Sequence, residues 1–420
     1  MPISVFEIRV HDLKYGMYVS SLDRPWLETP FPIQGFIVKS ELDKERLSQY
    51  CEYVYIDVQK SNIKSIPKHI IDLNNNPNAT RDSHQIYKLT HLDRILYQKT
   101  TSRDDELESA KDNFRVIEDT YHNLLNDVEN DVQFDLPAVK KAIKPMVRSI
   151  VRNPDSYIWL TYLKSINRYT YHHAISCSVW AVAFGRHLGL PAHMLNSLAI
   201  GCFLFDIGKS KLPKELLDSD KKLTTEEFET VKRHVPYGLE IVKKHKGIGK
   251  DILAMIETHH ERHDGSGYPK QLKGGGIPLY GRIAGLVDIY DAITSPRPFC
   301  NPIPTYEAIA SMYEWRGVEF QTELIEQFIQ VVGIYPVGSL VELSNNTVGV
   351  VIAQSEYSRL RPQIMVLLDE KKKLLKEFYI VDLKLESDNE DIDQENSEGL
   401  TISRGLPPGA YDLDHSKYYL

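Results

Sequence analysis

The spacing of apolar and polar positions predicts strands and one helix at the start of the chain. The expected elements are a strand over Val5–Val10, a short strand over Gly35–Val38, a helix over Glu41–Tyr50 and a strand over Tyr53–Asp57. The strands follow from alternation with a period of two, and the helix from apolar positions three and four residues apart. This order predicts a small N-terminal α/β domain over residues 1–62.

Two different patterns follow this domain. Residues 63–85 contain the run Asn74–Asn78, interrupted by Pro77, and because Asn and Pro favour turns, we expect a linker there. Residues 86–148 are helical in spacing and heavily charged. This pattern predicts a connecting helical segment, which would form a hairpin or a surface for a homodimer.

Residues 149–337 have the pattern of successive helices. Tyr171–Leu188 has helical spacing and is followed by Gly189, and we expect Pro191 in the first turn of the next helix, where its missing N–H is harmless. Thr224–Glu227 has the sequence of a capping box, which predicts the start of the helix that carries His234. We therefore expect an all-helical domain.

The pattern changes to strands after Gly338. Runs at Leu340–Leu343, Val348–Ala353, Ile364–Leu368 and Phe378–Val381 alternate as strands do, and they predict a small β module over residues 338–385. Residues 386–420 begin with an acidic stretch that has almost no apolar side chains. Such a composition cannot bury enough apolar surface to order a chain, so we expect a disordered tail.

Composition narrows the function classes. The 420 residues are 42% hydrophobic and 26% charged, which is typical of an ordinary globular protein with several domains. The net charge of -8 argues against general nucleic-acid binding and against binding to an anionic membrane. No apolar run is long enough to span a bilayer, no secretory leader is recognisable, and the four cysteines are scattered. We expect a cytoplasmic protein with reduced thiols.

Side chains that can bind metals recur along the helical region. They are His173, Asp206 with Lys209 close by, His234, the adjacent pair His259–His260, and Asp288. A single histidine on a helix is more often an ordinary surface or core residue. Six nitrogen and oxygen donors with no thiolate among them favour iron, manganese or another octahedral ion over structural zinc. A carboxylate between two sets of histidines could bridge two metals that activate water for attack on a phosphodiester.

These residues stand in segments that resemble the HD-GYP domain, a subgroup of the HD superfamily of metal-dependent phosphohydrolases. The matching segments are Phe205–Lys209, His234 before Val235–Pro236, His259–Arg262, Asp264–Pro269, Ile277–Pro278, Arg282–Ile283, Asp288–Ala292 and Arg297–Phe299. Residues 4–58, with Gly16–Val19 and Pro25–Leu27, are similar to the small domain that often precedes it. The resemblance implies a mainly α fold, with an HD-type all-helical bundle flanked by the α/β domain and the β module.

The resemblance also implies a function, which is hydrolysis of cyclic di-GMP at a centre of two or three divalent metals. Carried over by position, His173 and Asp288 would bind the first metal, and Asp206 would bridge to the second. The remaining implied roles are second-metal ligation by His234, His259 and His260, phosphate contact or proton donation by Lys209, and substrate contact by Gly267, Tyr268 and Arg297.

The chain departs from the family pattern at a ligand position. The histidine that gives the HD motif its name is Phe205 here, and a phenyl ring cannot bind a metal. Losing even a residue that only orients a ligand costs about 10–100-fold in metal affinity or activity, so we expect a weakened first metal site. Tyr169 stands where members with a third metal have Glu, His263 where Trp is usual, and Cys300 where a basic residue is common.

Three functions therefore stay open from the sequence. The first is a weakened cyclic di-GMP phosphodiesterase with one or two iron or manganese ions per chain. The second is a degenerate module that binds cyclic di-GMP, a metal or a partner protein in signalling. The third is another phosphohydrolase of the HD superfamily that acts on a different nucleotide.

Overall fold

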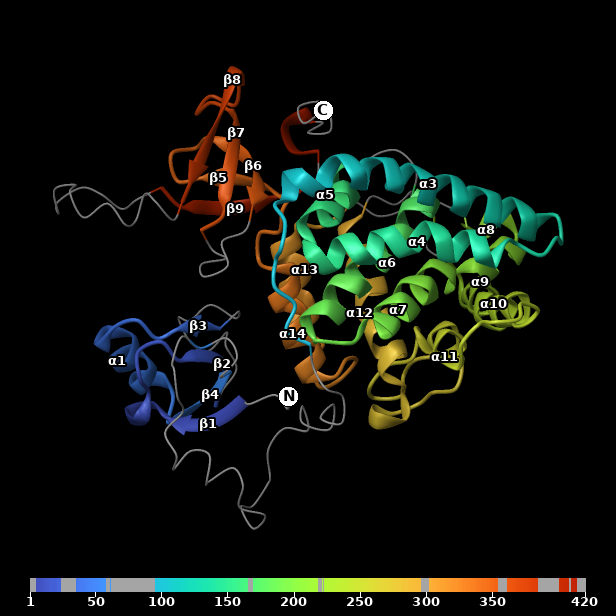
Figure 1. Ribbon diagram of the computed structural model, residues 1–420, viewed down its shortest axis with the longest axis horizontal. Helices are drawn as coiled ribbons and strands as arrows, with labels where there is room; N and C mark the ends of the chain where they lie inside the picture. The colour runs from blue at the N-terminus through green and yellow to red at the C-terminus, as the bar shows by residue number, and fades with distance from the viewer. Residues whose placement is uncertain are drawn as a thin grey trace, which may run out of the picture. The chain divides into compact units, whose positions relative to one another are not determined.

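A computed structural model describes residues 5–23, 35–57, 61, 95–164, 169–217, 221, 223–295, 302–353, 361–383, 400–407 and 409–413 (Figure 1). The chain divides into two compact units, one of residues 1–95 with 355–360 and one of residues 96–354 with 361–420. The expected linker run Asn74–Asn78, the Pro25–Leu27 segment and the acidic stretch 386–398 lie outside the described residues. The six-part domain division stays a prediction.

The described part of the first unit contains a four-stranded antiparallel sheet and a helix. Its elements are β1 (Val5–Arg9), the 3-10 turn η1 (Val10–Asp12), β2 (Tyr18–Leu22), β3 (Phe36–Ile37), α1 (Glu41–Tyr50) and β4 (Tyr53–Asp57). The strand order is β1-β4-β2-β3, and a capping box between Ser40 and Asp43 starts α1. The predicted α/β arrangement is confirmed. The sequence interpretation missed β2, which pairs with both β3 and β4.

The second unit is mainly helical, as predicted. Its helices are α3 (Arg103–Glu129), α4 (Leu136–Arg152), α5 (Asp155–Lys164), α6 (Tyr169–His187), α7 (Ala192–Leu204), α8 (Lys214–Leu217), α9 (Thr225–Lys232), α10 (His234–Lys243), α11 (Lys250–Thr258), α12 (Leu279–Thr294), α13 (Thr305–Glu314) and α14 (Thr322–Val332). Helices α6 and α7 pack together, and α12, α4 and α5 also pack against α6. Nine of the thirteen residues of α7 are buried, and its polar residues that are not buried, His193, Asn196 and Ser197, lie together in its N-terminal part.

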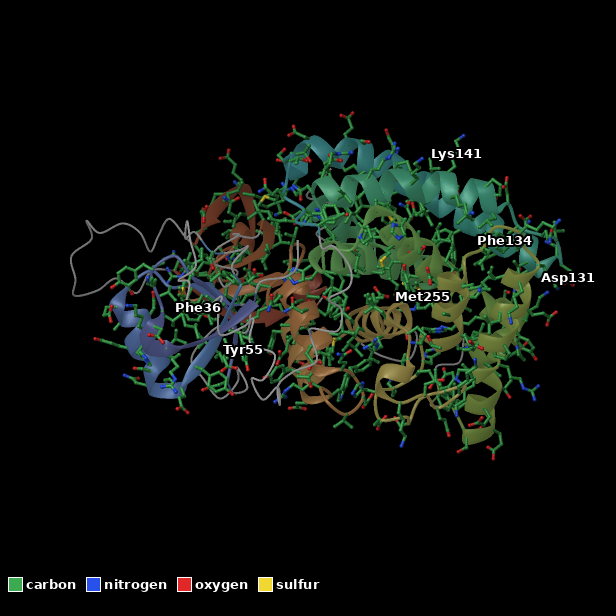
Figure 2. All side chains as sticks on the ribbon, turned by 60° about the horizontal axis from the view of Figure 1, so that its bottom comes forward. Phe36, Tyr55, Asp131, Phe134, Lys141 and Met255 are labelled. Atoms are coloured by element: carbon green, nitrogen blue, oxygen red, sulfur yellow. The ribbon has the colours of Figure 1, made fainter. Side chains whose placement is uncertain are left out.

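Helices α3 and α4 form a hairpin on this helical body. Phe114, Ile117 and Tyr121 belong to the buried face of α3, and α4 packs against both α6 and α7. Both helices bury apolar side chains. The hairpin agrees with the sequence pattern, and the role of residues 86–148 as a connecting segment stays a prediction. Figure 2 shows the exposed Lys141 on the outside of this hairpin and the buried Met255 inside the body.

One predicted helix is two helices in the structure. The capping box at Thr224 and Glu227 is present, but α9 ends at Lys232 and His234 is the first residue of α10. Pro236 explains the break, because proline lacks the N–H that an internal helical position needs and is tolerated in a first turn. Pro191 differs by one position from its prediction, because it caps α7 instead of lying inside the first turn.

A five-stranded antiparallel sheet follows the helices. Its strands are β5 (Leu340–Leu343), β6 (Val348–Ala353), β7 (Gln363–Leu368), β8 (Leu374–Asp382) and β9 (Ile402–Leu406), in the order β8-β7-β6-β5-β9. The predicted β module is confirmed as a sheet. The expectation of disorder through residues 386–420 is wrong at β9, because its backbone pairs with β5 and Leu406 is buried. Among the described residues, no helix is long and apolar enough to cross a membrane.

Candidate metal centre

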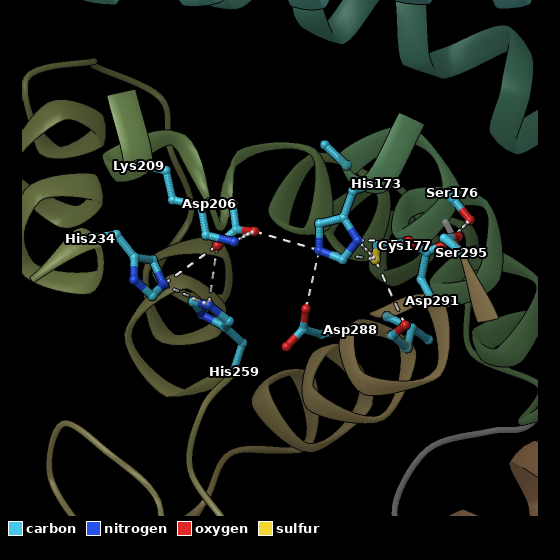
Figure 3. A network of polar contacts seen from close by, with 12 residues as sticks. His173, Ser176, Cys177, Asp206, Lys209, His234, His259, Asp288, Asp291 and Ser295 are labelled. Atoms are coloured by element: carbon cyan, nitrogen blue, oxygen red, sulfur yellow. Dashed lines mark hydrogen bonds and ion pairs between the residues drawn. The ribbon is translucent and has the colours of Figure 1, made fainter. Parts of the chain in front are cut away.

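The six predicted metal ligands come from five places in the helical unit and meet in one cluster. Figure 3 labels five of them, all except His260. His173 lies on α6, Asp206 follows α7, His234 begins α10 and Asp288 lies on α12. His259 caps the C-terminal end of α11, and His260 is the next residue along the chain. These donors are spread over more than a hundred positions of the sequence, and the packing of the helices brings them together.

Close backbone contact sets the position of Asp206 beside α10. Asp206 is the N-cap of η4 (Ile207–Lys211), which packs against α10. A Cβ added at Gly208 would lie 1.9 Å from the carbonyl oxygen of His234, so only glycine fits at this position. The short side chain thus lets the Asp206 turn approach the helix that presents His234.

One half of the cluster contains Asp206 and three histidines. The Oδ1 atom of Asp206 lies 3.4 Å from Nε2 of His234 and 3.8 Å from Nε2 of His259. The two Nε2 atoms lie 3.4 Å from each other, and His260 supplies the fourth donor of this group. We refer to Asp206, His234, His259 and His260 as the four-donor half-site.

The hydrogen bonds of His234 and His259 show what this half-site can bind. Nδ1 of His234 lies 2.7 Å from the carbonyl oxygen of Val231, and Nδ1 of His259 lies 2.9 Å from that of Ile256. A carbonyl oxygen only accepts, so each Nδ1 carries the proton and each Nε2 presents a lone pair in the neutral ring. Oδ1 of Asp206 is buried without a hydrogen bond in the described structure. Three acceptors that face one another without a donor fit a cation.

Electrostatics keep these imidazoles in the form that binds metals. Burial lowers the pKa of His234 to about 4 and also lowers the pKa values of His259 and His260. Burial opposes ionisation of Asp206, but the charge of Lys209 holds its pKa well below the usual range. Neutral imidazoles around an ionised carboxylate are the protonation states that metal binding requires.

The other half of the cluster has fewer donors. Nε2 of His173 lies 3.1 Å from Oδ1 of Asp288 and 3.5 Å from Oδ2 of Asp206. Burial opposes ionisation of Asp288 as well, but the close contact with the His173 imidazole holds its pKa far below the usual range. We refer to His173, Asp206 and Asp288 as the three-donor half-site, and it shares Asp206 with the four-donor half-site.

Phe205 lies against both half-sites. Its side chain is fully buried, and its ring centroid lies 5.8 Å from that of His173 and 4.8 Å from that of His259. The ring planes of Phe205 and His173 are nearly parallel, at 22°. An apolar ring therefore occupies the interior next to the three-donor half-site, and it offers no ligand atom.

Sequence reasoning missed the residues that hold His173. Oδ2 of Asp291 lies 2.7 Å from Nδ1 of His173, and Oδ1 of Asp291 accepts hydrogen bonds from the hydroxyls of Ser176 and Ser295 (Figure 3). A carboxylate on the far nitrogen fixes the tautomer and orientation of a metal-binding histidine. Asp291 stands one helical turn after Asp288, and this spacing was the available signal.

A thiol also lies near His173, although the donor set was expected to contain none. Sγ of Cys177 lies 3.7 Å from Nδ1 of His173, and the two residues are one turn apart on α6. Burial raises the pKa of the Cys177 thiol to about 12. The group therefore stays a neutral thiol near pH 7, and the nitrogen and oxygen donors remain the better ligands.

Lys209 is held at the edge of the cluster by Asp206. Its Nζ lies 2.5 Å from Oδ2 of Asp206, and its side chain is 32% exposed. Oδ2 is the oxygen that faces His173, so the ammonium lies beside the three-donor half-site. The position suits a cation that meets an anionic ligand arriving from solvent.

The loop after His260 covers that histidine. The ring of Tyr268 stacks on His260 with centroids 4.6 Å apart and planes at 27°. A Cβ at Gly267 would lie 2.3 Å from the backbone nitrogen of Arg262, so Gly267 is needed for this packing. Glu261, which sequence reasoning assigned no role, accepts hydrogen bonds from the backbone N–H groups of Lys270 and Leu272. Arg297 and Cys300 lie outside the described residues.

The cluster lies in the part of the chain that matches the profile of a known domain family. An HD domain profile matches residues 160–324, a domain of unknown function (DUF3391) matches residues 6–139, and a KOW domain associated with HD domains matches residues 340–389. The chain is 30% identical to the cyclic di-GMP phosphodiesterase PA4108 of Pseudomonas aeruginosa over 378 residues, which cover 90% of this chain and 88% of that protein.

Two further similarities are more limited. The 3'3'-cGAMP-specific phosphodiesterase 2 of Vibrio cholerae is 30% identical over 172 residues, which cover 40% of this chain and 32% of that protein. The solved structure of Bd1817, an HD-GYP protein of Bdellovibrio bacteriovorus, aligns with a TM-score of 0.45 and 16% identity over 78% of this chain and 99% of that one.

Proposed function

The chain belongs to the HD-GYP family of HD-domain phosphodiesterases, and from this premise we propose that its buried cluster hydrolyses cyclic di-GMP to the linear dinucleotide. One relative that carries this substrate in its name, PA4108 of Pseudomonas aeruginosa, matches nine-tenths of the chain. The observation that carries the proposal is the group of facing acceptors, namely Asp206 Oδ1 with Nε2 of His234 and His259, which leaves room for a cation and for no proton donor.

We propose divalent iron or manganese as the bound metal, because mixed imidazole and carboxylate donors suit these ions. The four-donor half-site would hold the tighter ion. The three-donor half-site would hold a second ion more weakly, because Phe205 supplies no ligand there. When bound, the ions supply positive charge that polarises the phosphodiester and lowers the pKa of water.

The side chains of this protein have distinct tasks in the proposed reaction. Asp206 and the histidines fix the metal positions, and Asp291 orients His173 through its Nδ1–H. Lys209 places an ammonium where the phosphate would bind, so it would stabilise negative charge or protonate the leaving 3'-oxygen. Tyr268 and Gly267 would form a wall of the substrate site, and Arg297 would contact a phosphate.

The test compares purified wild-type protein with two histidine variants. With manganese or iron, the wild type should convert cyclic di-GMP to the linear dinucleotide, and His259→Ala should lose this activity together with bound metal. His193→Ala is the matched control, because His193 is an exposed histidine on α7 that lies outside the cluster. Equal activity in all three proteins would show that the cluster is not the catalytic centre.

Phe205 favours one alternative function. If the three-donor half-site binds no metal at all, the protein would bind cyclic di-GMP without cleaving it and would act as a signalling module. Binding without turnover, with turnover gained in Phe205→His, would support that alternative. A panel that includes 3'3'-cGAMP, the substrate named for the Vibrio cholerae relative, separates both from a phosphodiesterase of different base preference.

A further inference from the structure

An exposed aromatic side chain stands beside the loop that covers the metal centre. Phe228 lies on α9 and is 44% exposed, and α9 has no buried residue. Its ring meets the ring of Tyr268 edge to face, with centroids 6.2 Å apart. Because Tyr268 in turn stacks on His260, the rings lead from a candidate metal ligand to the protein surface.

A lysine ammonium lies over the same rings. Nζ of Lys232 lies 4.9 Å from the ring centroid of Phe228 and 5.4 Å from that of Tyr268. Lys232 stands one turn after Phe228 on α9, and it also pairs with Glu229 at 2.6 Å. The helix thus presents an aromatic face and a positive charge together, on the side that faces the Tyr268 loop.

This pair matches chemistry that a cyclic dinucleotide carries. Such a molecule has two purine bases and two phosphates, and only one phosphodiester can occupy the metal centre at a time. The bases need flat apolar surfaces, and the second phosphate needs a cation outside the cluster. A single exposed apolar residue is common on any protein. Phe228, however, lies between a lysine ammonium and the Tyr268 ring, where an aromatic base and a phosphate of one ligand could both be contacted.

We propose that Phe228 and Lys232 form a substrate subsite in which Phe228 stacks on a purine base and Lys232 attracts the phosphate that is not being cleaved. The inference rests on the proposed phosphodiesterase function and adds two residues that determine substrate affinity. Stacking depends on the flat face of a base, which guanine and adenine share. The subsite therefore contributes to binding of cyclic di-GMP and of 3'3'-cGAMP alike.

The test measures steady-state hydrolysis of cyclic di-GMP by manganese-loaded full-length protein. Phe228→Leu should raise KM by about 5- to 100-fold, the range expected for loss of one stacked base, while kcat and bound metal change little. Phe228→Trp should keep the wild-type KM, because it restores an aromatic face. Tyr379→Leu is the matched control, since Tyr379 is a 47% exposed aromatic residue on β8.

A second variant tests the charge. Lys232→Gln should raise KM and weaken its dependence on salt, because it removes a partly exposed cation that attracts an anionic substrate. Lys244→Gln is its control, since Lys244 is 60% exposed and is also paired along its own helix, with Glu240.

The results separate this inference from the proposed function. A wild type that neither binds nor hydrolyses cyclic di-GMP would overturn both. A wild type that hydrolyses it while Phe228→Leu keeps the same KM would overturn the subsite alone. The subsite would also fall if Phe228→Trp behaved like Phe228→Leu, or if Tyr379→Leu raised KM as much.

Discussion

Replacing Phe205 by histidine should repair the three-donor half-site. The phenyl ring is fully buried and lies 5.8 Å from the ring of His173, so an imidazole at this position would stand next to His173 and Asp206. The change converts a group that cannot bind metal into one that can. We expect Phe205→His to bind one more divalent ion per chain than the wild type and to hydrolyse cyclic di-GMP faster.

The magnitude has two opposing parts. Without metal, the variant loses the burial of a phenyl side chain, worth about 1.5–3 kcal/mol, so its free energy of unfolding should fall by roughly that amount. With metal at about 100 times its dissociation constant, binding to the folded state returns about 2.7 kcal/mol. Since altering even an outer partner of a metal ligand changes activity by about 10–100-fold, we expect a gain of at least about tenfold.

The assay records three quantities on one preparation of each protein. These are metal content after gel filtration, thermal midpoint with EDTA or with manganese, and the rate of linear dinucleotide formation. Phe203→His is the matched control, because Phe203 is also buried, stands two residues earlier and packs against Tyr121. It should lower the midpoint in EDTA as well, with no gain in metal content or rate.

One pattern of results would refute this reasoning. If Phe205→His matched the wild type in both metal content and rate while folding normally, Phe205 would not stand at a vacant ligand position. A gain of metal and rate in Phe203→His as well would show that the effect comes from general loosening of the helical body.

Three other changes have expected outcomes of their own. Asp291→Asn should weaken metal binding at His173 by about 10–100-fold with little change at the four-donor half-site, because an amide cannot hold the Nδ1–H of His173 as a carboxylate does. Metal titration with wild-type protein as the reference checks this prediction. Metal-free protein should lose stability as pH falls from 6.5 toward 4, since the pKa of His234 is about 4 in the folded chain and 6.5 when unfolded. In this pH range the unfolded chain binds more protons than the folded chain, and His234 contributes about 3 kcal/mol to the pH dependence of the free energy of unfolding. Equal urea midpoints at pH 7 and pH 5 would contradict this prediction. Glu106→Gln should lower the free energy of unfolding by about 2–4 kcal/mol, because Glu106 is buried and accepts two hydrogen bonds from Arg152. Glu108→Gln, on the exposed side of α3, should change the free energy of unfolding little. Equal urea midpoints for the two variants would contradict the prediction.

The sequence predicted the fold class and much of the element order, because its patterns were strong. Glu41–Tyr50 and Tyr53–Asp57 have the same bounds in the structure as in the prediction. Strands β2 and β9 were missed because their apolar positions do not alternate regularly: the pairing of β2 shifts register between Val19 and Ser21, and only Leu406 of β9 is buried. The break between α9 and α10 was missed although Pro236 indicated it.

The candidate ligands could be selected from residue type and family resemblance, and their roles stay predictions. What the sequence could not supply was the direction of each lone pair. The carbonyl oxygens of Val231 and Ile256 fix the orientation of the His234 and His259 rings, and these contacts form only where the ends of α9 and α11 are placed in the structure. Asp291 and Glu261 lie within matching segments, but the sequence assigns them no role, because their contacts with His173 and with the loop after His260 exist only in the packed structure. Homodimer formation, a partner protein and cytoplasmic localisation also stay predictions.

Metal stoichiometry combined with hydrolysis on the same wild-type preparation tests the central claim most directly. The protein would be stripped with EDTA, reloaded with manganese or iron, and assayed for bound metal and for cleavage of cyclic di-GMP. We predict at least one tightly bound ion per chain, with linear dinucleotide formed only by the reloaded protein. Tight metal binding without any cleavage, or cleavage that survives complete removal of metal, would contradict the account.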